Sequence, residues 1–420
     1  MAEARMPVLN DPHYLAHLTQ AAGACDVRAT DDISTQNGMK LIARGTRIEP
    51  RHLERLIAHK LSRPIDHLVS VTDPVSPGDL VDQARQLAVA EPFARLVSAG
   101  RTLDRAIGLL GQLNCLPVLA GKLAILKERL PEQFDHSVRV SLCTAVIAER
   151  LGYAPQDCVD AATAGISHDI GNLHIDPAIF RTQGRLTEEQ RRQIKAHPLI
   201  GHLILNEFKL YTPLVSDAVL QHHERLDGSG YPKGLRAAEL GMLGKILAAA
   251  EVAVSVLERD PELDMPVFLR SHGGMLDREA LASLITESNA VDPGQRRRRS
   301  VEPQRVSERI QLLNHAIVAW EAGLGANPSK PERYVGQRLE LIGRNLIRAG
   351  LGPDDPPERL TELADDLELL SELDVLSQEG LFQLRTTIQE VKQRWLEHDK
   401  PGGTFSNWLK EMEALFGPAL

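Results

Sequence analysis

Helix start and stop signals recur at short intervals between residues 131 and 259, and they restrict this region to a succession of packed helices. The apolar periodicity of residues 136–151 ends at Gly152, a residue type favoured just after a helix, and Pro155 suits the first turn of the next helix. Thr187–Gln190 matches a capping box, which predicts the start of another helix. Aromatic residues make up only 4% of the chain, which favours helices over a β-sandwich or barrel. We therefore expect a mainly α fold.

The chain divides at segments rich in proline and glycine, and its 420 residues are enough for two or three domains. Residues 39–43 are predicted as a short strand and residues 49–60 as a helix. The segment 290–302 contains the run Arg296–Arg299 and is predicted to be an exposed linker. We predict a small α+β module, a helical linker, a helical phosphohydrolase-type domain and a helical C-terminal domain, at residues 1–75, 76–130, 131–289 and 303–420.

Composition excludes some classes of protein. The net charge is −9, whereas proteins that bind duplex DNA are usually basic. The four cysteines form no CxxC pair, which is typical of reduced thiols inside a cell. No apolar run approaches the roughly 18 residues that a membrane-spanning helix needs. We therefore expect a cytoplasmic protein that neither binds DNA nor spans a membrane.

Histidines and carboxylates gather at the ends of the predicted helices. They are Glu132, His136, His168, Asp169, His197, His222, His223 and Glu251. Neutral imidazoles and carboxylates are ligands for transition metals, and the lack of cysteine in the set disfavours a structural zinc site. Two ions about 3.5–4 Å apart can share a hydroxide and clamp a phosphoryl oxygen. The set therefore predicts a metal site, although each residue alone could equally be an ordinary polar group.

A glycine-rich loop follows directly after two of these histidines. The segment 222–232 reads His-His-Glu-Arg-Leu-Asp-Gly-Ser-Gly-Tyr-Pro. Glycines allow the backbone to approach a ligand closely, and Tyr231 would offer a ring face or a hydroxyl. The alternative is a tight turn that only connects two helices.

Together these motifs resemble the HD-GYP family of metal-dependent phosphohydrolases. Family members have a histidine about 30 residues before His-Asp-Ile-Gly-Lys, then His-Pro-x-x-Gly, then the His-His-Glu to Gly-Tyr-Pro segment. This chain has matching elements in that order, at residues 136, 168–171, 197–201 and 222–232. The resemblance covers about residues 131–287.

The resemblance implies a helical domain that holds two or three divalent transition-metal ions, with iron or manganese expected. It also implies hydrolysis of the bacterial second messenger cyclic di-GMP to pGpG or GMP. By this resemblance the eight histidines and carboxylates named above are the metal ligands, and Asp169 is a bridging carboxylate. The loop residues expected to contact the substrate are Asp227, Gly228, Gly230, Tyr231 and Pro232.

This chain departs from the family pattern at positions that handle phosphate. Asn172 stands where the family has lysine, so it can donate a hydrogen bond but supplies no charge. Glu251 replaces an aspartate, and Gly244-Lys245 stands where an arginine is common. With these changes, the resemblance gives catalytic roles to Asp169, Asn172 and Lys245. His174 and His202 match no family ligand and are predicted to lie on the surface or behind the ligands.

We therefore expect a cyclic di-GMP phosphodiesterase of bacterial signalling, with activity lowered by these departures. One alternative is a catalytically weak member that binds cyclic di-GMP or a protein as a sensor or adaptor. Another is a phosphohydrolase of a different nucleotide. Leucines from 360 to 373 recur at helical spacing and indicate either a helical core or a surface for partners, such as diguanylate cyclases of the GGDEF type. A homodimer is also left open.

Overall fold

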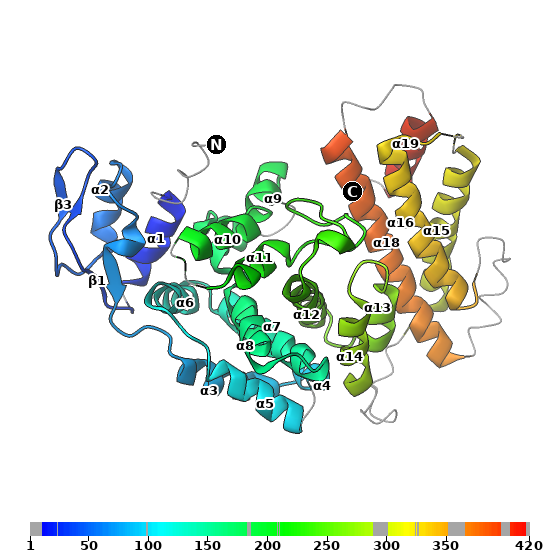
Figure 1. Ribbon diagram of the computed structural model, residues 1–420. Helices are drawn as coiled ribbons and strands as arrows, with labels where there is room; N and C mark the ends of the chain where they lie inside the picture. The colour runs from blue at the N-terminus through cyan, green and yellow to red at the C-terminus, as the bar shows by residue number, and fades with distance from the viewer. Residues whose placement is uncertain are drawn as a thin grey trace. The chain divides into compact units, whose positions relative to one another are not determined.

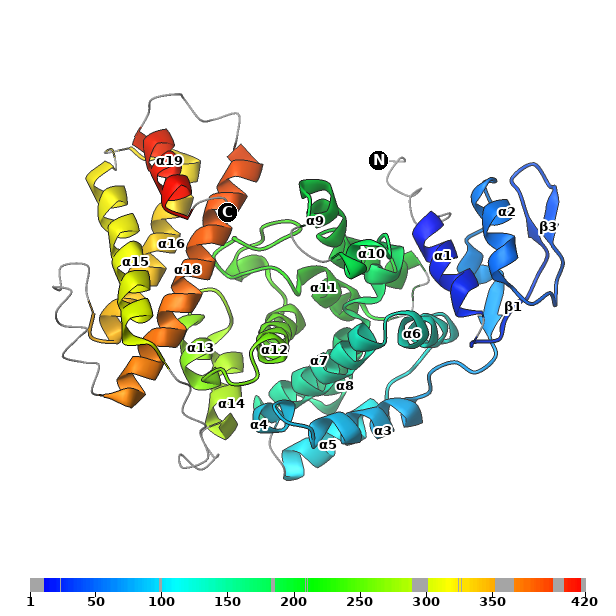
Figure 2. The ribbon, with the colours of Figure 1, turned by 180° about the vertical axis from the view of Figure 1, so that it is seen from behind.

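The computed structural model of the chain is mainly helical, with a small region of short strands (Figures 1 and 2). This confirms the predicted fold class. The described residues divide into two compact units, one formed by 1–261 with 275–291 and the other by 262–274 with 292–420. The structure describes residues 11–22, 24–97, 100–182, 186–207, 209, 211–288, 301–323, 325, 327–351, 366–395 and 404–416.

The first unit begins with the α+β region. The side chain of Asp11 accepts a hydrogen bond from the backbone of His13 and caps the first helix. Two antiparallel strand pairs follow, β1 with β4 and β2 with β3. The elements are α1 (Pro12–Ala21), β1 (Val27–Ala29), β2 (Ile33–Ser34), β3 (Lys40–Ile42), η1 (Pro50–His52), α2 (Leu53–Ile57), η2 (Ile65–His67) and β4 (Val69–Val71).

The segment predicted as a linker, residues 76–130, instead packs onto the rest of the first unit. Its four helices are α3 (Pro77–Ala88), α4 (Phe93–Val97), α5 (Arg101–Leu110) and α6 (Pro117–Arg129). All four contact α7 (Pro131–Arg150), and each buries apolar residues. On α3, for example, Leu80, Ala84 and Leu87 are buried.

Six further α-helices follow α7 in the described part of the first unit. They are α8 (Pro155–Ser167), α9 (Glu188–Ile194), α10 (His197–Glu207), α11 (Pro213–Gln221), α12 (Met242–Arg259) and α14 (Arg278–Ser288). A Cβ added at Gly165 would lie 2.5 Å from the Cα of Ser141, so glycine permits the close packing of α8 on α7. The single helix expected after Thr187 is in fact two, because Pro198 lacks the amide that would continue it. His197 therefore begins α10.

The second unit is a bundle of helices. They are α13 (Met265–Ser271), α15 (Pro303–Gly323), α16 (Lys330–Arg348), α18 (Leu367–Trp395) and α19 (Thr404–Phe416). The sequence placed α13 in the preceding domain, but its apolar residues Phe268 and Leu269 are buried and it packs on α18. Leu370 and Leu373 of the leucine pattern are buried too. The run Arg296–Arg299, like Leu360 and Leu363, lies outside the described residues.

Within the part of the chain that the structure describes, no helix is both long enough and apolar enough to cross a membrane.

Candidate metal centre

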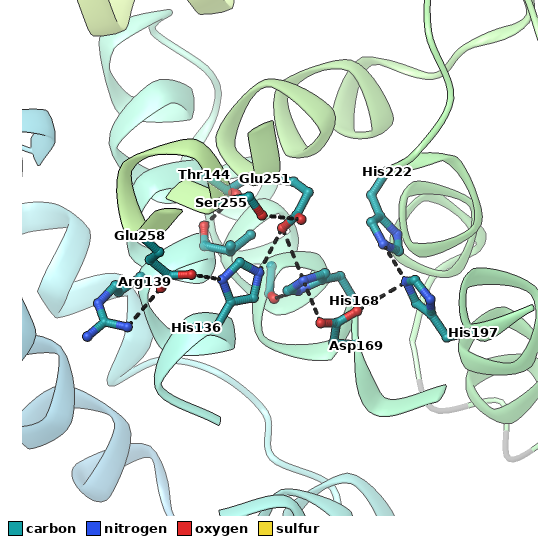
Figure 3. A network of polar contacts seen from close by, with 12 residues as sticks. His136, Arg139, Thr144, His168, Asp169, His197, His222, Glu251, Ser255 and Glu258 are labelled. Atoms are coloured by element: carbon teal, nitrogen blue, oxygen red, sulfur yellow. Dashed lines mark hydrogen bonds and ion pairs between the residues drawn. The ribbon is translucent and has the colours of Figure 1, made fainter. Parts of the chain in front are cut away.

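Seven of the eight expected ligands come together in the first unit, mostly from positions where a helix begins or ends. Figure 3 labels these ligands except His223. His168 and Asp169 follow the last residue of α8, His197 begins α10, and His222 and His223 follow α11. His136 and Glu251 instead project from within α7 and α12. Helix ends are suited to building a ligand cluster, because several helices can point their termini at one place while their apolar sides pack elsewhere.

Three of the imidazoles are fixed by the backbone behind them. In each, Nδ1 lies within hydrogen-bonding distance of the carbonyl three residues earlier, and because a carbonyl can only accept, Nδ1 must carry the proton. In the neutral ring this leaves the Nε2 lone pair facing the other ligands, as in metal-binding histidines. The bonds run from His168 to Gly165 (2.7 Å), from His197 to Ile194 (2.7 Å) and from His222 to Val219 (2.6 Å).

One end of the cluster is made of histidines alone. The Nε2 atoms of His197 and His222 lie 3.0 Å apart, and the ring centroid of His223 lies 4.2 Å from that of His222. Burial, together with the neighbouring histidines, lowers the pKa of His222 to about 3 and holds the pKa of His223 well below its usual value. Two neutral nitrogens that turn lone pairs toward each other repel, so this arrangement fits a cation held between them.

The other end contains the carboxylate of Glu251. One of its oxygens lies 2.9 Å from Nε2 of His136 and 3.4 Å from Nε2 of His168. His168 is fully buried, yet its Nε2 makes no hydrogen bond within the described residues. Burial opposes ionisation of Glu251, but His136 and His168 outweigh it and hold the pKa of this carboxyl well below its usual value. A buried carboxylate and an orphaned ring nitrogen fit a second cation.

Asp169 lies between the two ends. Its Oδ1 is 3.1 Å from Nε2 of His197, and its Oδ2 is 3.4 Å from Nε2 of His168. Although burial favours the neutral acid, these two histidines lower the pKa of Asp169 and keep it ionised. One oxygen directed toward each end is the arrangement that a bridging carboxylate needs.

The possible ligand atoms form three overlapping groups, each with all its atoms within 4.8 Å of one another: His197, His222 and His223; His136, His168 and Glu251; and His168, Asp169 and His222. Imidazole and carboxylate donors without cysteine fit divalent transition metals such as iron or manganese. Glu132 belongs to none of these groups among the described residues and lies exposed in the first turn of α7.

Two residues that the sequence did not single out hold His136 from behind. Glu258 accepts a hydrogen bond from Nδ1 of His136 at 2.8 Å, and Arg139 donates to the other oxygen of Glu258, also at 2.8 Å (Figure 3). Ser255 donates to Glu251 at 2.8 Å. Glu258 lies seven residues, about two turns, after Glu251 on α12, so the spacing was a signal that could have identified it.

Glu224 shapes the loop that follows the paired histidines. Its buried carboxylate accepts hydrogen bonds from three successive backbone amides, those of Lys233 (2.7 Å), Gly234 (3.1 Å) and Leu235 (2.9 Å). A Cβ at Gly230 would lie 2.3 Å from the Cα of Glu224, so the loop packs tightly against this residue. Glu224 belongs to the motif at residues 222–232, but the sequence analysis predicted no role for it.

The far side of the loop reaches the cluster through Tyr231. The Tyr231 ring stacks on that of His223 with centroids 4.6 Å apart, and Nζ of Lys195 lies 5.5 Å from the Tyr231 centroid. Asp227 accepts the amide of Ser229 at 2.9 Å and thereby forms the turn at Gly228, where φ is +81°. Pro232 follows Tyr231 and completes the segment.

The two residues expected to handle phosphate, Asn172 and Lys245, lie in different surroundings. Asn172 is four residues after His168, but the two are not joined by a continuous α-helical turn, because the chain leaves α geometry at Asp169 and continues as the 3₁₀ helix η3 (Ile170–His174). Asn172 is buried, and its Oδ1 has no hydrogen-bond partner among the described residues. Lys245 is half-buried and six residues before Glu251, which places it on a different face of α12, about 120° round the axis.

The predicted position of His174 is wrong. It lies neither on the surface nor behind a ligand, but is buried in a separate group of polar residues. His202, by contrast, is half-buried on α10 and bonds to the carbonyl of Ser216 at 2.9 Å.

Comparisons with known proteins agree with this geometry. Residues 123–262 match the family model described as HD domain. The chain is 33% identical over 157 residues to the 3'3'-cGAMP-specific phosphodiesterase 3 of Vibrio cholerae, covering 37% of this chain and 33% of that protein. It is 35% identical over 133 residues to a cyclic di-GMP phosphodiesterase of Thermotoga maritima, covering 31% of this chain and 36% of that protein.

The chain thus spans about a third of the length of these curated relatives. Among solved structures, the HDG"Y"P protein Bd1817 of Bdellovibrio bacteriovorus is 17% identical and matches with a TM-score of 0.34, over 63% of this chain and 96% of that one. That score is too low to add to the argument.

Proposed function

From the match of residues 123–262 to the HD domain model and the similarity to cyclic dinucleotide phosphodiesterases, we infer that this chain is a metal-dependent phosphodiesterase of the HD-GYP type that hydrolyses cyclic di-GMP. The observation that carries the proposal is Asp169, which lies between a group of histidines and a group containing Glu251, with one oxygen toward each. Such an arrangement supports two ions side by side, and a pair of ions can stabilise both the attacking and the leaving oxygen in phosphodiester hydrolysis.

We propose that His197, His222 and His223 hold one ion, that His136, His168 and Glu251 hold another, and that Asp169 serves both. The donor set favours iron or manganese. When bound, the ions would activate a water nucleophile and offset the negative charge of the phosphate. A third ion at Glu132 stays a proposal, because this carboxylate lies outside the three ligand groups.

The chain's own residues would then do three things. Glu258 and the backbone carbonyls keep four of the imidazoles, those of His136, His168, His197 and His222, in one orientation, which limits the reorganisation needed during the reaction. Glu224 holds the loop that we propose borders the substrate, where Tyr231 offers a ring face. Lys195, beside that ring, would supply a positive group for the phosphate.

A sensor or adaptor role is the second candidate function. The observation that favours it is Asn172, an uncharged residue where the family has lysine, because a phosphodiester could bind and yet turn over slowly. Hydrolysis of another cyclic dinucleotide is also open, since one relative is named for 3'3'-cGAMP.

The test is turnover by protein purified without oxygen or chelators and loaded with iron or manganese. We expect at least two ions per chain and conversion of cyclic di-GMP to linear product, with 3'3'-cGAMP assayed in parallel. His168→Ala with Asp169→Ala should abolish both metal binding and turnover, whereas the control His202→Ala should retain both. Binding of cyclic di-GMP without turnover would establish the sensor role instead, and turnover of 3'3'-cGAMP alone would reassign the substrate.

We further propose that the protein acts in the cytoplasm, where its proposed substrate is made. Contacts with diguanylate cyclases and homodimer formation stay proposals for the second unit. Leu370 and Leu373, two residues of the leucine pattern that suggested a partner surface, are buried. At least this part of the leucine face is therefore not available to a partner. Phe382, also on α18, is 52% exposed and is the better starting point for a partner contact. Sedimentation of the wild-type protein and of Phe382→Ser would test self-association.

A further inference from the structure

A second group of buried and half-buried polar side chains lies in the first unit, outside the metal centre. Its members are Asp11 and Tyr14 at the start of α1, Asp66 on η2, Lys122 on α6 and His174 on η3. Figures 1 and 2 both show α6 beside α1, and both helices contact η3. The group therefore joins the N-terminal α+β region to the segment that directly follows His168 and Asp169.

Lys122 is at the middle of this group and is only 1% exposed. Its Nζ lies 3.0 Å from a carboxylate oxygen of Asp66, 3.4 Å from Nε2 of His174, and 3.5 Å from the centroid of the Tyr14 ring. A buried ammonium is costly unless each of its hydrogens has a partner, and here it has an anion, a lone pair and a ring face. Burial lowers the pKa of Lys122, while Asp66 opposes that shift.

His174 is held on two edges and one face. Its Nδ1 lies 3.0 Å from a carboxylate oxygen of Asp11, and Nε2 faces Lys122. The ring stacks on Tyr14 with centroids 4.7 Å apart and an interplanar angle of 15°. Tyr14 in turn donates to Asp66 at 2.5 Å. Three segments of the chain thus fix the end of η3.

The other end of η3 abuts the metal centre. It starts immediately after Asp169, and the amide of Asn172 donates to the carbonyl of Asp169 at 2.9 Å. A Cβ added at Gly171 would lie 2.2 Å from the carbonyl oxygen of His197, so η3 touches the first turn of α10 with no space to spare. A shift of η3 at His174 must therefore be passed on to Asp169 or to His197.

We propose that Lys122 and His174 are positioning residues for the metal centre, through which the N-terminal α+β region determines how rigidly Asp169 is held. A ligand or partner that moved α1 would then act on the centre through η3. The effect on metal retention rests on the proposed function, but the effect on the mobility of η3 does not.

The test removes both buried charges together, so that no unpaired charge is left behind. In Lys122→Met with Asp66→Asn, we expect hydrogen exchange at the amides of Asn172 and Ile175 to become at least about tenfold faster, while exchange in α12 stays unchanged. Metal loss to a chelator should become at least about fivefold faster, and kcat should fall with KM little changed.

The matched control is Gln20→Ala. Gln20 accepts a hydrogen bond from Arg129 at 2.6 Å, so it also joins α1 to α6, but without touching η3. We expect this variant to match the wild type in exchange at η3 and in metal retention. An equal effect of the control would show that general loosening of the interface is responsible, and would overturn the proposal.

Two milder substitutions decide the matter if the double variant does not fold. His174→Phe keeps the stacked ring but loses both polar contacts, and Tyr14→Phe loses only the hydroxyl. We expect faster exchange at η3 in both, with the larger change in His174→Phe. If these variants fold but show the same hydrogen exchange at η3 and the same metal retention as the wild type, the proposal is overturned. A chain that binds no metal but still shows faster exchange would reject the proposed function and leave the coupling of α1 to η3 intact.

Discussion

At the scale of single residues, the centre depends on side chains that are each held by one specific partner. Backbone carbonyls fix His168, His197 and His222, and Glu258 fixes His136. The lone pairs are thereby aimed before any ion arrives, which lowers the cost of binding one. Asn172 is the exception, since the Oδ1 of this buried side chain has no partner among the described residues.

Asn172→Lys should raise the rate of cyclic di-GMP hydrolysis by at least about tenfold, or roughly 1.4 kcal/mol. A lysine here would add positive charge close to Asp169, where the phosphate becomes more negative in the transition state. The measurement is single-turnover hydrolysis at matched metal occupancy. Asn172→Met is the control, because methionine is similar in length to lysine but carries no charge. This variant should give no increase in the rate of hydrolysis. A lysine variant no faster than the wild type would contradict the prediction.

His17 provides a test at a residue remote from the ligands. It is 1% exposed, and neither of its ring nitrogens has a hydrogen-bond partner among the described residues. Burial, and then Arg129, lower the pKa of His17 from 6.5 to about 4. The unfolded chain therefore binds the proton more tightly, so stability is full above pH 6.5 and is lost as the pH falls toward 4.

Between pH 7 and pH 5 we expect His17 to account for a loss of about 2 kcal/mol in the free energy of unfolding of the first unit. His17→Leu should remove that part of the pH dependence, because leucine can remain buried without a proton. Urea unfolding of the wild type and the variant at pH 7 and pH 5 measures this difference in the free energy of unfolding. His59→Leu, at a half-buried position in the same region, serves as the control and should retain the full dependence. An unchanged pH dependence in His17→Leu would refute the assignment.

At the scale of elements, short segments between helices carry most of the function. The helices supply rigid packing, as where α8 lies against α7 at Gly165. The loop at residues 225–236 and the 3₁₀ helix η3 supply the surroundings of the ligands. Both are held by buried charged side chains, Glu224 for the loop and Lys122 for η3. Because each segment has few such anchors, a change at one anchoring residue is expected to loosen it more than it would loosen a well-packed helix.

Gly230→Ala should displace the loop, because the added methyl would lie 2.3 Å from the Cα of Glu224. We expect a loss of about 1–3 kcal/mol in stability and a rise in KM for the cyclic dinucleotide, with metal content unchanged. Gly108→Ala is the matched control, since a Cβ there meets nothing within 4 Å on the helix α5. It should be neutral or stabilise the protein by up to about 1 kcal/mol. Equal KM values for the two variants would argue against a role of the loop at the substrate.

At the scale of the whole molecule, the two units do not follow the order of the chain. Residues 262–274 belong to the second unit, although residues on both sides of them, up to 261 and from 275, belong to the first. The reason is apolar burial: Met265, Phe268 and Leu269 are nearly inaccessible to solvent within the second unit. His272 also lies 3.1 Å from the buried Glu379 of α18. A cut at the apparent linker therefore does not separate the two units.

A chain that ends after Ser300 should keep the metal centre but lose the partners of α13. We expect it to bind metal at the wild-type stoichiometry and to be cleaved by protease within residues 262–274, where the full-length chain is protected. Its exposed apolar residues should also promote self-association, which Phe268→Ser with Leu269→Ser would relieve. Limited proteolysis with mass analysis of the fragments measures this. Protection of residues 262–274 in the shortened chain would contradict the division into these two units.

The sequence alone determined the local features of this protein. Helix boundaries at Gly152 and Pro155, the capping box at Thr187 and the helical class follow from short-range spacing and backbone preferences. The identity of the histidine and carboxylate donors could also be read directly, because the chemistry of a ligand is a property of its side chain.

Tertiary structure decided which residues meet. Glu258 reaches His136 across 122 positions of the chain, and Asp11 reaches His174 across 163. It also decided that Asp169 lies between two ligand groups, that Glu132 stays apart from them, and that α13 joins the second unit. Contacts of this kind depend on how helices pack, and packing is set by the summed burial of many side chains rather than by the spacing of a few.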